Sequence, residues 1–218
     1  MRIYAMSDIH GCLNAFENAL SLIKLSGNNK LILLGDYIHR GPDSYAVLEK
    51  ILSLQKQYDE DRIIALLGNH ETMALSGEWP INGEGFDENS DKKYLDWFLT
   101  LPRYYATKHQ IFCHAGVDED YGDMWKYTDS SIFTEKSFAQ TGHFCMDIIA
   151  GHFGTGSIAG DKTFHDIYYD GKSHYYIDGT VLKSGKIPVL MVDTETNKYY
   201  QVTESGPWPI MPYGKEYY

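Results

Sequence analysis

Six polar residues, each next to a short apolar run, together have the chemistry of a metal-binding site. They are Asp8, His10, Asp36, Asn69, His114 and His152. Carboxylate and amide oxygens combined with imidazole nitrogens suit Mn, Fe or Zn better than Ca, which prefers oxygen ligands alone. Six donors, including a carboxylate able to bridge, exceed what one tetrahedral site needs. We therefore expect these residues to hold two divalent metal ions.

The elements that must position these donors are five strand-sized apolar runs, each leading to polar residues. The runs span residues 3–6, 31–34, 63–67, 111–113 and 146–150, with helical patterns over 13–25 and 44–57. This alternation predicts parallel pairing with right-handed crossovers. Ligands in open α/β sheets bind beyond the carboxyl ends of the strands, so we expect all five ends to meet on one sheet. Asp8 and His10 should lie on an extended segment that points both side chains the same way.

Past Ser157 the sequence changes to alternating aromatic and polar residues separated by turns. This pattern predicts an antiparallel meander that forms a second sheet. The fold class is then α/β (α+β), a two-layered mixed β-sandwich flanked by helices. Its length fits one domain over 1–218, with the ligand-bearing part at about 1–152 and the meander and tail at about 157–218. The acidic loop 78–91, a helix near 92–101 and a surface tail from Gly206 complete the expected organisation.

Composition and charge exclude several classes of protein. The net charge of −11 argues against a broad nucleic-acid surface, which must be basic. Apolar runs are strand-sized and fall short of the roughly 18 to 20 residues that span a bilayer, and polar Asp8 comes too early for a signal peptide. Three cysteines without CxxC spacing suit a reducing compartment. We expect a cytoplasmic protein with neither nucleic-acid nor membrane partners; the oligomeric state is left open.

Five ordered segments resemble the motif set of the calcineurin-like metallophosphoesterases. They are Ser-Asp-Ile-His-Gly at 7–11, Gly-Asp-Tyr-Ile-His-Arg-Gly at 35–41, Gly-Asn-His-Glu at 68–71, His-Ala-Gly at 114–116 and Gly-His at 151–152. More narrowly, they resemble the phosphoprotein phosphatase branch, which includes bacterial serine/threonine phosphatases and symmetrical diadenosine tetraphosphatases. Ile177-Asp178-Gly179 extends the resemblance weakly. The resemblance to this family implies a four-layer architecture in which helices flank the sandwich. It also implies that the protein is a hydrolase that works with manganese, or with iron and zinc.

The resemblance also implies a role for each residue of the site. Asp8, His10 and Asp36 would hold the first metal, and Asp36 would bridge to a second metal held by Asn69, His114 and His152. Two such metals make a bridging water a hydroxide and clamp the phosphoryl oxygens for in-line attack. Arg40 would bind the remaining phosphate oxygens, and His70 would protonate the leaving oxygen.

The sequence departs from this family pattern in three ways, one of which is Phe-Gly after His152 where the family commonly has Thr-Pro. His39 stands where the family has a second aspartate that orients and charges the catalytic histidine. A neutral imidazole can accept one hydrogen bond from His70 but cannot offset the charge of an imidazolium. The chain also lacks an arginine between His114 and His152, where this branch often supplies a second phosphate clamp. Lys126 could replace it as a point charge, without the bidentate fork of arginine.

These residues leave three functions open. The leading one is a serine/threonine protein phosphatase that also cleaves small phosphomonoesters. An alternative is hydrolysis of diadenosine tetraphosphate or another nucleotide, which ranks lower because few arginines are present to hold a polyphosphate. A non-enzymatic metal-binding module with weakened chemistry is the third. Glu71 is expected to serve the start of a helix, and the remaining histidines are expected at the surface or in turns: His109, His143, His165 and His174.

Overall fold

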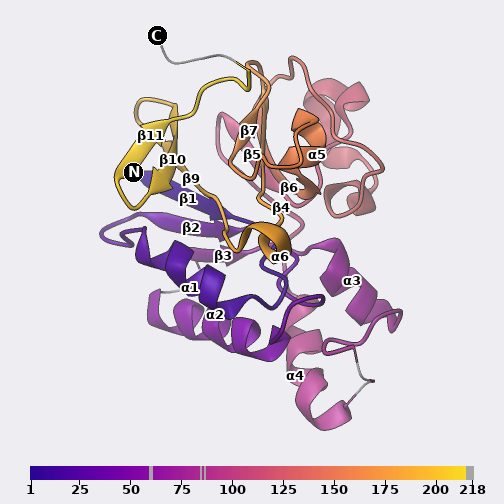
Figure 1. Cartoon of the computed structure of the whole chain (residues 1–218). Helices are drawn as coiled ribbons and strands as arrows, with labels where there is room; N and C mark the ends of the chain where they lie inside the picture. The colour runs from indigo at the N-terminus through magenta and orange to yellow at the C-terminus, as the bar shows by residue number, and fades with distance from the viewer. Residues whose placement is uncertain (59–60, 84, 86, 215–218) are drawn as a thin grey trace.

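Two mixed β-sheets are packed face to face, and helices cover them (Figure 1). The computed structural model describes residues 1–58, 61–83, 85 and 87–214. The first sheet has the order β11-β10-β9-β1-β2-β3, built from Gly206–Pro209, Lys198–Thr203, Val189–Asp193, Arg2–Met6, Lys30–Leu33 and Ile63–Ala65. The second has the order β4-β5-β6-β8-β7, built from Tyr104–Ala106, Gln110–Cys113, Asp147–Gly154, His174–Asp178 and Tyr168–Tyr169. The predicted two-layered α/β sandwich is confirmed.

The first three strands and the helices between them follow the sequence-based prediction. β1 pairs in parallel with β2, and β2 pairs in parallel with β3. Helix α1 (Leu13–Ser21) and helix α2 (Ser44–Tyr58) make the two crossovers. Helix α1 ends at Ser21, short of the predicted residue 25. The shorter elements are α3 (Asn69–Ser76), α4 (Glu88–Phe98), α5 (Thr155–Ala159), α6 (Val181–Ser184) and the 3₁₀ segments η1 (Glu119–Tyr127) and η2 (Ser130–Phe133). No helix among the described residues has the length and apolar character needed to cross a membrane.

Alternating side chains along each strand face two different apolar clusters. Tyr4 and Met6 of β1 face the cluster formed with α1 and α2, whereas Ile3 and Ala5 lie in the cluster between the two sheets. A third cluster on the outer face of the second sheet contains Trp125 of η1. Burying a large apolar side chain stabilises the fold by about 2 kcal/mol. Because both faces of β1 are buried, its carboxyl end is held firmly where the polar residues begin.

The expectation that all five strand ends lie on one sheet is wrong. The ends of β1, β2 and β3 belong to the first sheet, and those of β5 and β6 belong to the second. The predicted meander is also wrong, because β8 pairs in parallel with β6 while β9 and β10 join the first sheet. Strands β8 and β9 are buried along almost their whole length, so each takes a covered place inside a sheet. The site therefore lies where two sheets meet.

The tail, the acidic loop and the short helix predicted from the sequence differ in part from the observed elements. Residues from Gly206 onward begin as the edge strand β11, which pairs antiparallel with β10, and therefore do not form a simple tail. Residues 215–218 of that tail, and residues 84 and 86 of the acidic loop, lie outside the described part of the chain. The helix predicted near 92–101 is α4, which begins earlier at Glu88.

His174 contradicts the expectation of a surface or turn position, because its side chain is buried in β8. Its ring nitrogens contact Asp170 Oδ2 and Glu119 Oε1, each at 3.0 Å. Burial opposes the charged ring, but Glu119 and Asp170 outweigh it and raise the pKa of His174. The ion pairs thereby tie η1 to the second sheet.

Replacing His174 by glutamine should lower the free energy of unfolding by about 2 kcal/mol at pH 6. A raised folded pKa gives stability that is complete below the unfolded value of about 6.5 and is lost as pH rises through the folded value. Urea unfolding at pH 6 and pH 9 checks this. The same replacement of exposed His109 is the control, and an equal loss for His174→Gln at both pH values would contradict the assignment.

Candidate metal centre

Strand ends from both sheets deliver the six predicted donors to one place. Asp8 and His10 follow β1, and Asp36 follows β2. Asn69 begins α3 just after β3, so the chain turns directly from strand to helix at the site. The last two donors come from the second sheet: His114 follows β5, and His152 lies within β6. All except His152 are buried, and His152 is half-buried.

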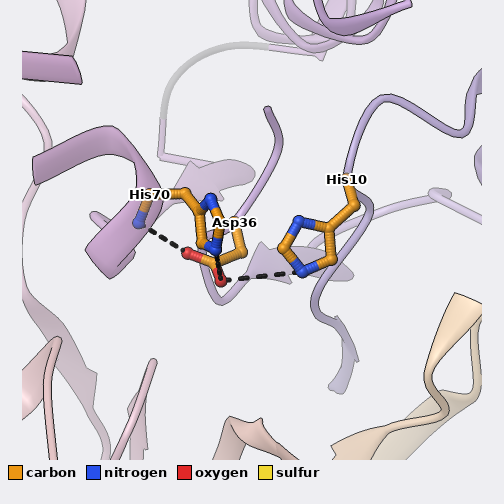
Figure 2. A group of neighbouring side chains, drawn as sticks. All are labelled: His10, Asp36 and His70. Carbon is orange, nitrogen blue, oxygen red and sulfur yellow. Dashed lines mark hydrogen bonds and ion pairs between the residues drawn. The ribbon is translucent and has the colours of Figure 1, made fainter. Parts of the chain in front are cut away.

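Asp36 is the centre of the first group of donors (Figure 2). Its Oδ2 lies 3.8 Å from Nε2 of His10 and 3.8 Å from Nε2 of His70. His10 Nε2 also lies 3.9 Å from Asp8 Oδ1. Donor atoms of His10, Asp36 and His70 all lie within 4.8 Å of one another, close enough to share one cation.

Asp36 belongs to a second group as well. Its Oδ1 lies 3.3 Å from Nε2 of His114, and donor atoms of Asp36, His114 and His152 again lie within 4.8 Å of one another. The amide oxygen of Asn69 lies 2.9 Å from His114 Nε2 and 3.0 Å from His152 Nδ1. One carboxylate therefore faces two adjacent groups of donors, as the bridging ligand of a dinuclear centre must.

The backbone of the site is unusual because several of its non-glycine residues have positive φ. Asp8, His10, Asp36 and His152 have φ of 54°, 47°, 57° and 63°. Such conformations cost about 1 to 3 kcal/mol each and cluster at functional sites. The expectation of an extended Asp8–His10 segment is therefore wrong. A left-handed turn after β1 directs both side chains to the site.

Two glycines allow the loops to approach closely. A Cβ at Gly68 would collide with the backbone nitrogen and carboxylate of Asp36, and a Cβ at Gly151 would collide with Ser7 and Asp8. Each loop can therefore take this conformation only with glycine, which has no Cβ, at the position before a proposed ligand. This explains in steric terms why glycine precedes Asn69 and His152.

Three histidines of the site, His10, His114 and His152, fit metal ions because each uses one ring nitrogen in a hydrogen bond to the backbone. His10 Nδ1 contacts Ile38 O at 3.1 Å, His114 Nδ1 contacts Leu34 O at 3.0 Å, and His152 Nε2 contacts Lys136 O at 3.2 Å. A carbonyl accepts a proton, so that nitrogen carries the hydrogen in the neutral ring. The other nitrogen of each ring lies in a donor group with Asp36 and could offer its lone pair to a metal ion held there. This outer hydrogen bond is typical of metal-ligating histidine.

The electrostatics of the buried acids also fit a cationic centre. Burial raises the pKa of Asp8 to about 6, and the neighbouring Asp36 adds to the rise. Burial alone would raise the pKa of Asp36, but His114, His70 and His10 together hold it well below its usual range. Burial opposes charge on His114 as well, yet Asp36 raises its pKa to about 9. A dication near Asp36 would compensate these acids and displace the proton of His114.

Asp178 is a buried acid near Asp8 and is not one of the six predicted donors. It ends β8, and burial together with Asp8 raises its pKa to about 7. The same pattern of an apolar strand ending in a polar residue was available in the sequence. Asp178 Oδ1 accepts the backbone N–H of Thr180 at 2.7 Å, which fixes the turn.

Glu71 serves the start of helix α3, as predicted, and also holds the loops of the site together. Its carboxylate accepts the N–H of Gly68 within the capping box of the helix. It also accepts the N–H groups of Asp36 and Tyr37, each at 2.8 Å. Glu71 is fully buried, so these three bonds join the loops after β2 and β3 away from solvent.

Of the two predicted substrate-binding residues, Arg40 and Lys126, only Arg40 acts electrostatically on described histidines of the site. Burial is the main cause of the lowered pKa values of His10, His70 and His152, and the charge of Arg40 lowers all three further. Its side chain is exposed. Lys126 is exposed on η1, with Nζ 5.3 Å from the Trp125 ring, and none of its described contacts reaches the ligand candidates.

Comparison with known proteins identifies the family. Residues 1–188 match the model described as calcineurin-like phosphoesterase. The chain belongs to this family. Its members are dinuclear metal-dependent hydrolases of phosphoesters, in agreement with the two donor groups around Asp36.

The chain is also similar to individual proteins, both in sequence and in solved structures. A symmetrical bis(5'-nucleosyl)-tetraphosphatase of Buchnera aphidicola is 36% identical over 123 residues, which are 55% of this chain and 40% of that protein. The chain thus matches less than half the length of that relative. A cold-active protein-tyrosine phosphatase of a Shewanella species has a TM-score of 0.68 and 14% identity, covering 96% of this chain and 80% of the other. A putative diadenosine tetraphosphatase has a TM-score of 0.64 and 17% identity, covering 95% and 94%. These two structures share the fold.

Proposed function

We propose that this chain hydrolyses phosphoric esters or anhydrides with two divalent metal ions. Asp8, His10 and Asp36 would hold one ion, and Asp36, Asn69, His114 and His152 would hold the other. The observation that carries this proposal is the position of Asp36 between two groups of donors, in which His10, His114 and His152 each contact a backbone carbonyl through the second ring nitrogen. When bound, such a pair of ions activates water and neutralises phosphoryl oxygens. Manganese is the first metal to test, with iron and zinc as alternatives.

The protein's own groups would orient the substrate beside this centre. Arg40 is the described arginine whose charge reaches three histidines of the site, so it is the candidate to bind phosphoryl oxygens. Its planar fork can donate two parallel hydrogen bonds and stabilise charge that spreads over those oxygens. The second positive group proposed from the sequence, Lys126, has no described contact in support of that role.

Replacing Arg40 by lysine should lower kcat/KM by about 10- to 100-fold, because lysine keeps the charge and loses the bidentate fork. Steady-state kinetics on p-nitrophenyl phosphate check this. Arg62→Lys is the matched control: Arg62 precedes β3 at the end away from the site and donates to Leu25 O and Asn29 O. Equal activity of Arg40→Lys and the control would remove Arg40 from the substrate site.

For the substrate, we propose dinucleoside tetraphosphate ahead of phosphoserine or phosphothreonine in proteins. The relative of Buchnera aphidicola is named for the nucleotide, which supports this order. The sequence-based preference for a serine/threonine protein phosphatase, and for a phosphoprotein partner, thus becomes the second candidate. Small phosphomonoesters would be cleaved in either case.

The experiment that tests the function compares three classes of substrate with manganese-loaded protein: p-nitrophenyl phosphate, diadenosine tetraphosphate, and peptides that carry phosphoserine or phosphothreonine. Hydrolysis that depends on added metal supports the proposed function, and the ratio of rates identifies the substrate class. Metal binding at about two ions per chain without turnover of any substrate would instead support the metal-binding module.

A further inference from the structure

The side chain of Trp79 lies beside the candidate metal centre and packs against two histidines next to it. Its ring stacks on His39 with centroids 4.4 Å apart and 14° between the planes, and its centroid lies 5.5 Å from that of His70. The ring of His70 also lies next to the carboxylate of Asp36, with Nε2 3.8 Å from Oδ2 (Figure 2). The indole is therefore within one side chain of the place where the proposed metal ions would bind.

The loop that carries Trp79 is held at several points. The backbone N–H of Trp79 donates to Met73 O, near the end of helix α3, at 3.3 Å. Pro80 O lies 2.9 Å from His39 Nε2, and Ile81 is buried in the cluster formed with α1 and α2. These contacts hold the indole in place before a substrate binds, so little conformational entropy is lost when a second ring packs against it.

Part of the indole is open to solvent, although one of its faces is covered by His39. Trp79 is half-buried, whereas His39 and His70 are both buried. The exposed surface of a fixed aromatic side chain is a platform on which another flat ring can stack. Stacking of this kind accepts any nucleobase, because every base has a π face. The open surface of Trp79 thus suits a planar aromatic group of the substrate.

Arg40, the candidate to bind phosphoryl oxygens, directly follows the histidine on which Trp79 stacks. His39 and Arg40 both have φ of 68°, a left-handed conformation that clusters at functional sites. A Cβ at Gly41 would collide with the backbone oxygen of His10, so this loop also lies against a proposed metal ligand. One short loop therefore joins the metal centre, the phosphate-binding candidate and the surface of the indole.

We propose that Trp79 determines substrate specificity by stacking on a nucleobase, while the phosphate chain of the same substrate lies along Arg40 and the metal centre. This inference rests on the proposed function and extends it to the nucleoside part of the substrate. A nucleobase is favoured over an aromatic side chain of a phosphopeptide, because every nucleotide carries a flat ring near its phosphate chain and a peptide does so only in some sequences.

The test compares KM for diadenosine tetraphosphate and for inorganic tetraphosphate, which has no base, with manganese-loaded protein. Trp79→Ala should raise KM for the dinucleotide by about tenfold or more, because a stacked base loses its partner. It should change KM for inorganic tetraphosphate by less than about twofold and leave kcat for both nearly unchanged. Trp79→Phe should recover most of the loss, because phenylalanine can still stack. Trp208→Ala, at an exposed tryptophan of β11, is the control.

Equal changes of KM for the two anhydrides would show that Trp79 acts only by packing on His39, and would overturn the inference. A larger effect of Trp79→Ala on a phosphoserine peptide than on the dinucleotide would also overturn it. So would a wild-type protein that cleaves p-nitrophenyl phosphate and leaves diadenosine tetraphosphate intact. Absence of metal-dependent hydrolysis of p-nitrophenyl phosphate in the wild type would instead overturn the proposed function.

The contact can also be measured in the wild type without turnover, which decides the question if Trp79→Ala does not fold. The probe is a methylene-bridged, non-hydrolysable analogue of diadenosine tetraphosphate, added to zinc-loaded protein. The indole N–H signal of Trp79, assigned by its loss in Trp79→Phe, should shift as the analogue binds. The signals of the other three tryptophans, Trp97, Trp125 and Trp208, should stay in place. A Trp79 signal that does not move at saturation would refute the stacking.

Discussion

Replacing Asp36 by asparagine should reduce phosphoester hydrolysis by at least about a hundredfold. Removing even an outer partner of a metal ligand costs about 10- to 100-fold in affinity or activity, and Asp36 faces both donor groups directly. Asparagine keeps the shape and removes the negative charge between His10, His70 and His114. The measurements are kcat/KM on p-nitrophenyl phosphate and the number of Mn²⁺ ions bound per chain.

Asp96→Asn is the control for this prediction, because Asp96 is an exposed acid of α4 paired with Lys92. It should bind metal and turn over like the wild type. Asp36→Asn should fold and bind fewer ions. Activity of Asp36→Asn within about threefold of the control would exclude Asp36 as a bridging ligand, since the loss of such a ligand must cost more.

Replacing Glu71 by glutamine should lower the free energy of unfolding by about 1 to 3 kcal/mol. The carboxylate accepts three buried backbone N–H groups, from Asp36, Tyr37 and Gly68. An amide has one acceptor oxygen, so its NH₂ group must face at least one of those donors and leave it without a partner. Because these donors belong to the loops of the site, metal affinity should fall as well.

Urea unfolding of metal-free protein checks the stability of Glu71→Gln. Glu17→Gln is the matched control, since Glu17 is an exposed partner of Lys50 and its pair is worth little. The free energy of unfolding should fall in Glu71→Gln and stay close to the wild-type value in Glu17→Gln. Equal stabilities of the two variants would show that the carboxylate does not hold the loops after β2 and β3.

The proximity of the candidate donors could be predicted from the sequence because burial and chemistry leave a clear local pattern. An apolar run covered on both faces must end where polar residues begin, and this pattern located the donors from Asp8 to His152. The same rule applied to β8 identifies Asp178, whose carboxyl lies near that of Asp8. The alternating aromatic and polar residues of 174–178 instead suggested one strand of an antiparallel meander.

The pairing of strands could not be predicted in the same way. Strand β9 lies beside β1, although the two are at opposite ends of the chain, because each buries both faces against the other layers. The burial of His174 likewise depends on Glu119, which comes from the 3₁₀ segment η1. Such contacts depend on the whole fold, and no local pattern of residues encodes them.

The position of single side chains around the site could not be predicted from the sequence either. Lys126 lies in the stretch between His114 and His152 that lacks an arginine, but it is exposed on η1 beside Trp125, which is buried in the outer cluster. The backbone carbonyl of Lys136, in contrast, accepts from Nε2 of His152. A main-chain contact of this kind leaves no signal in the residue type.

The most direct test of the proposed dinuclear centre is a titration of metal-free protein with Mn²⁺. Binding is measured by calorimetry, and p-nitrophenyl phosphate hydrolysis is measured in the same samples. We predict that about two ions bind per chain and that hydrolysis rises as the second ion binds. Binding of no more than one ion, or full hydrolysis in the metal-free protein, would contradict a dinuclear centre built around Asp36.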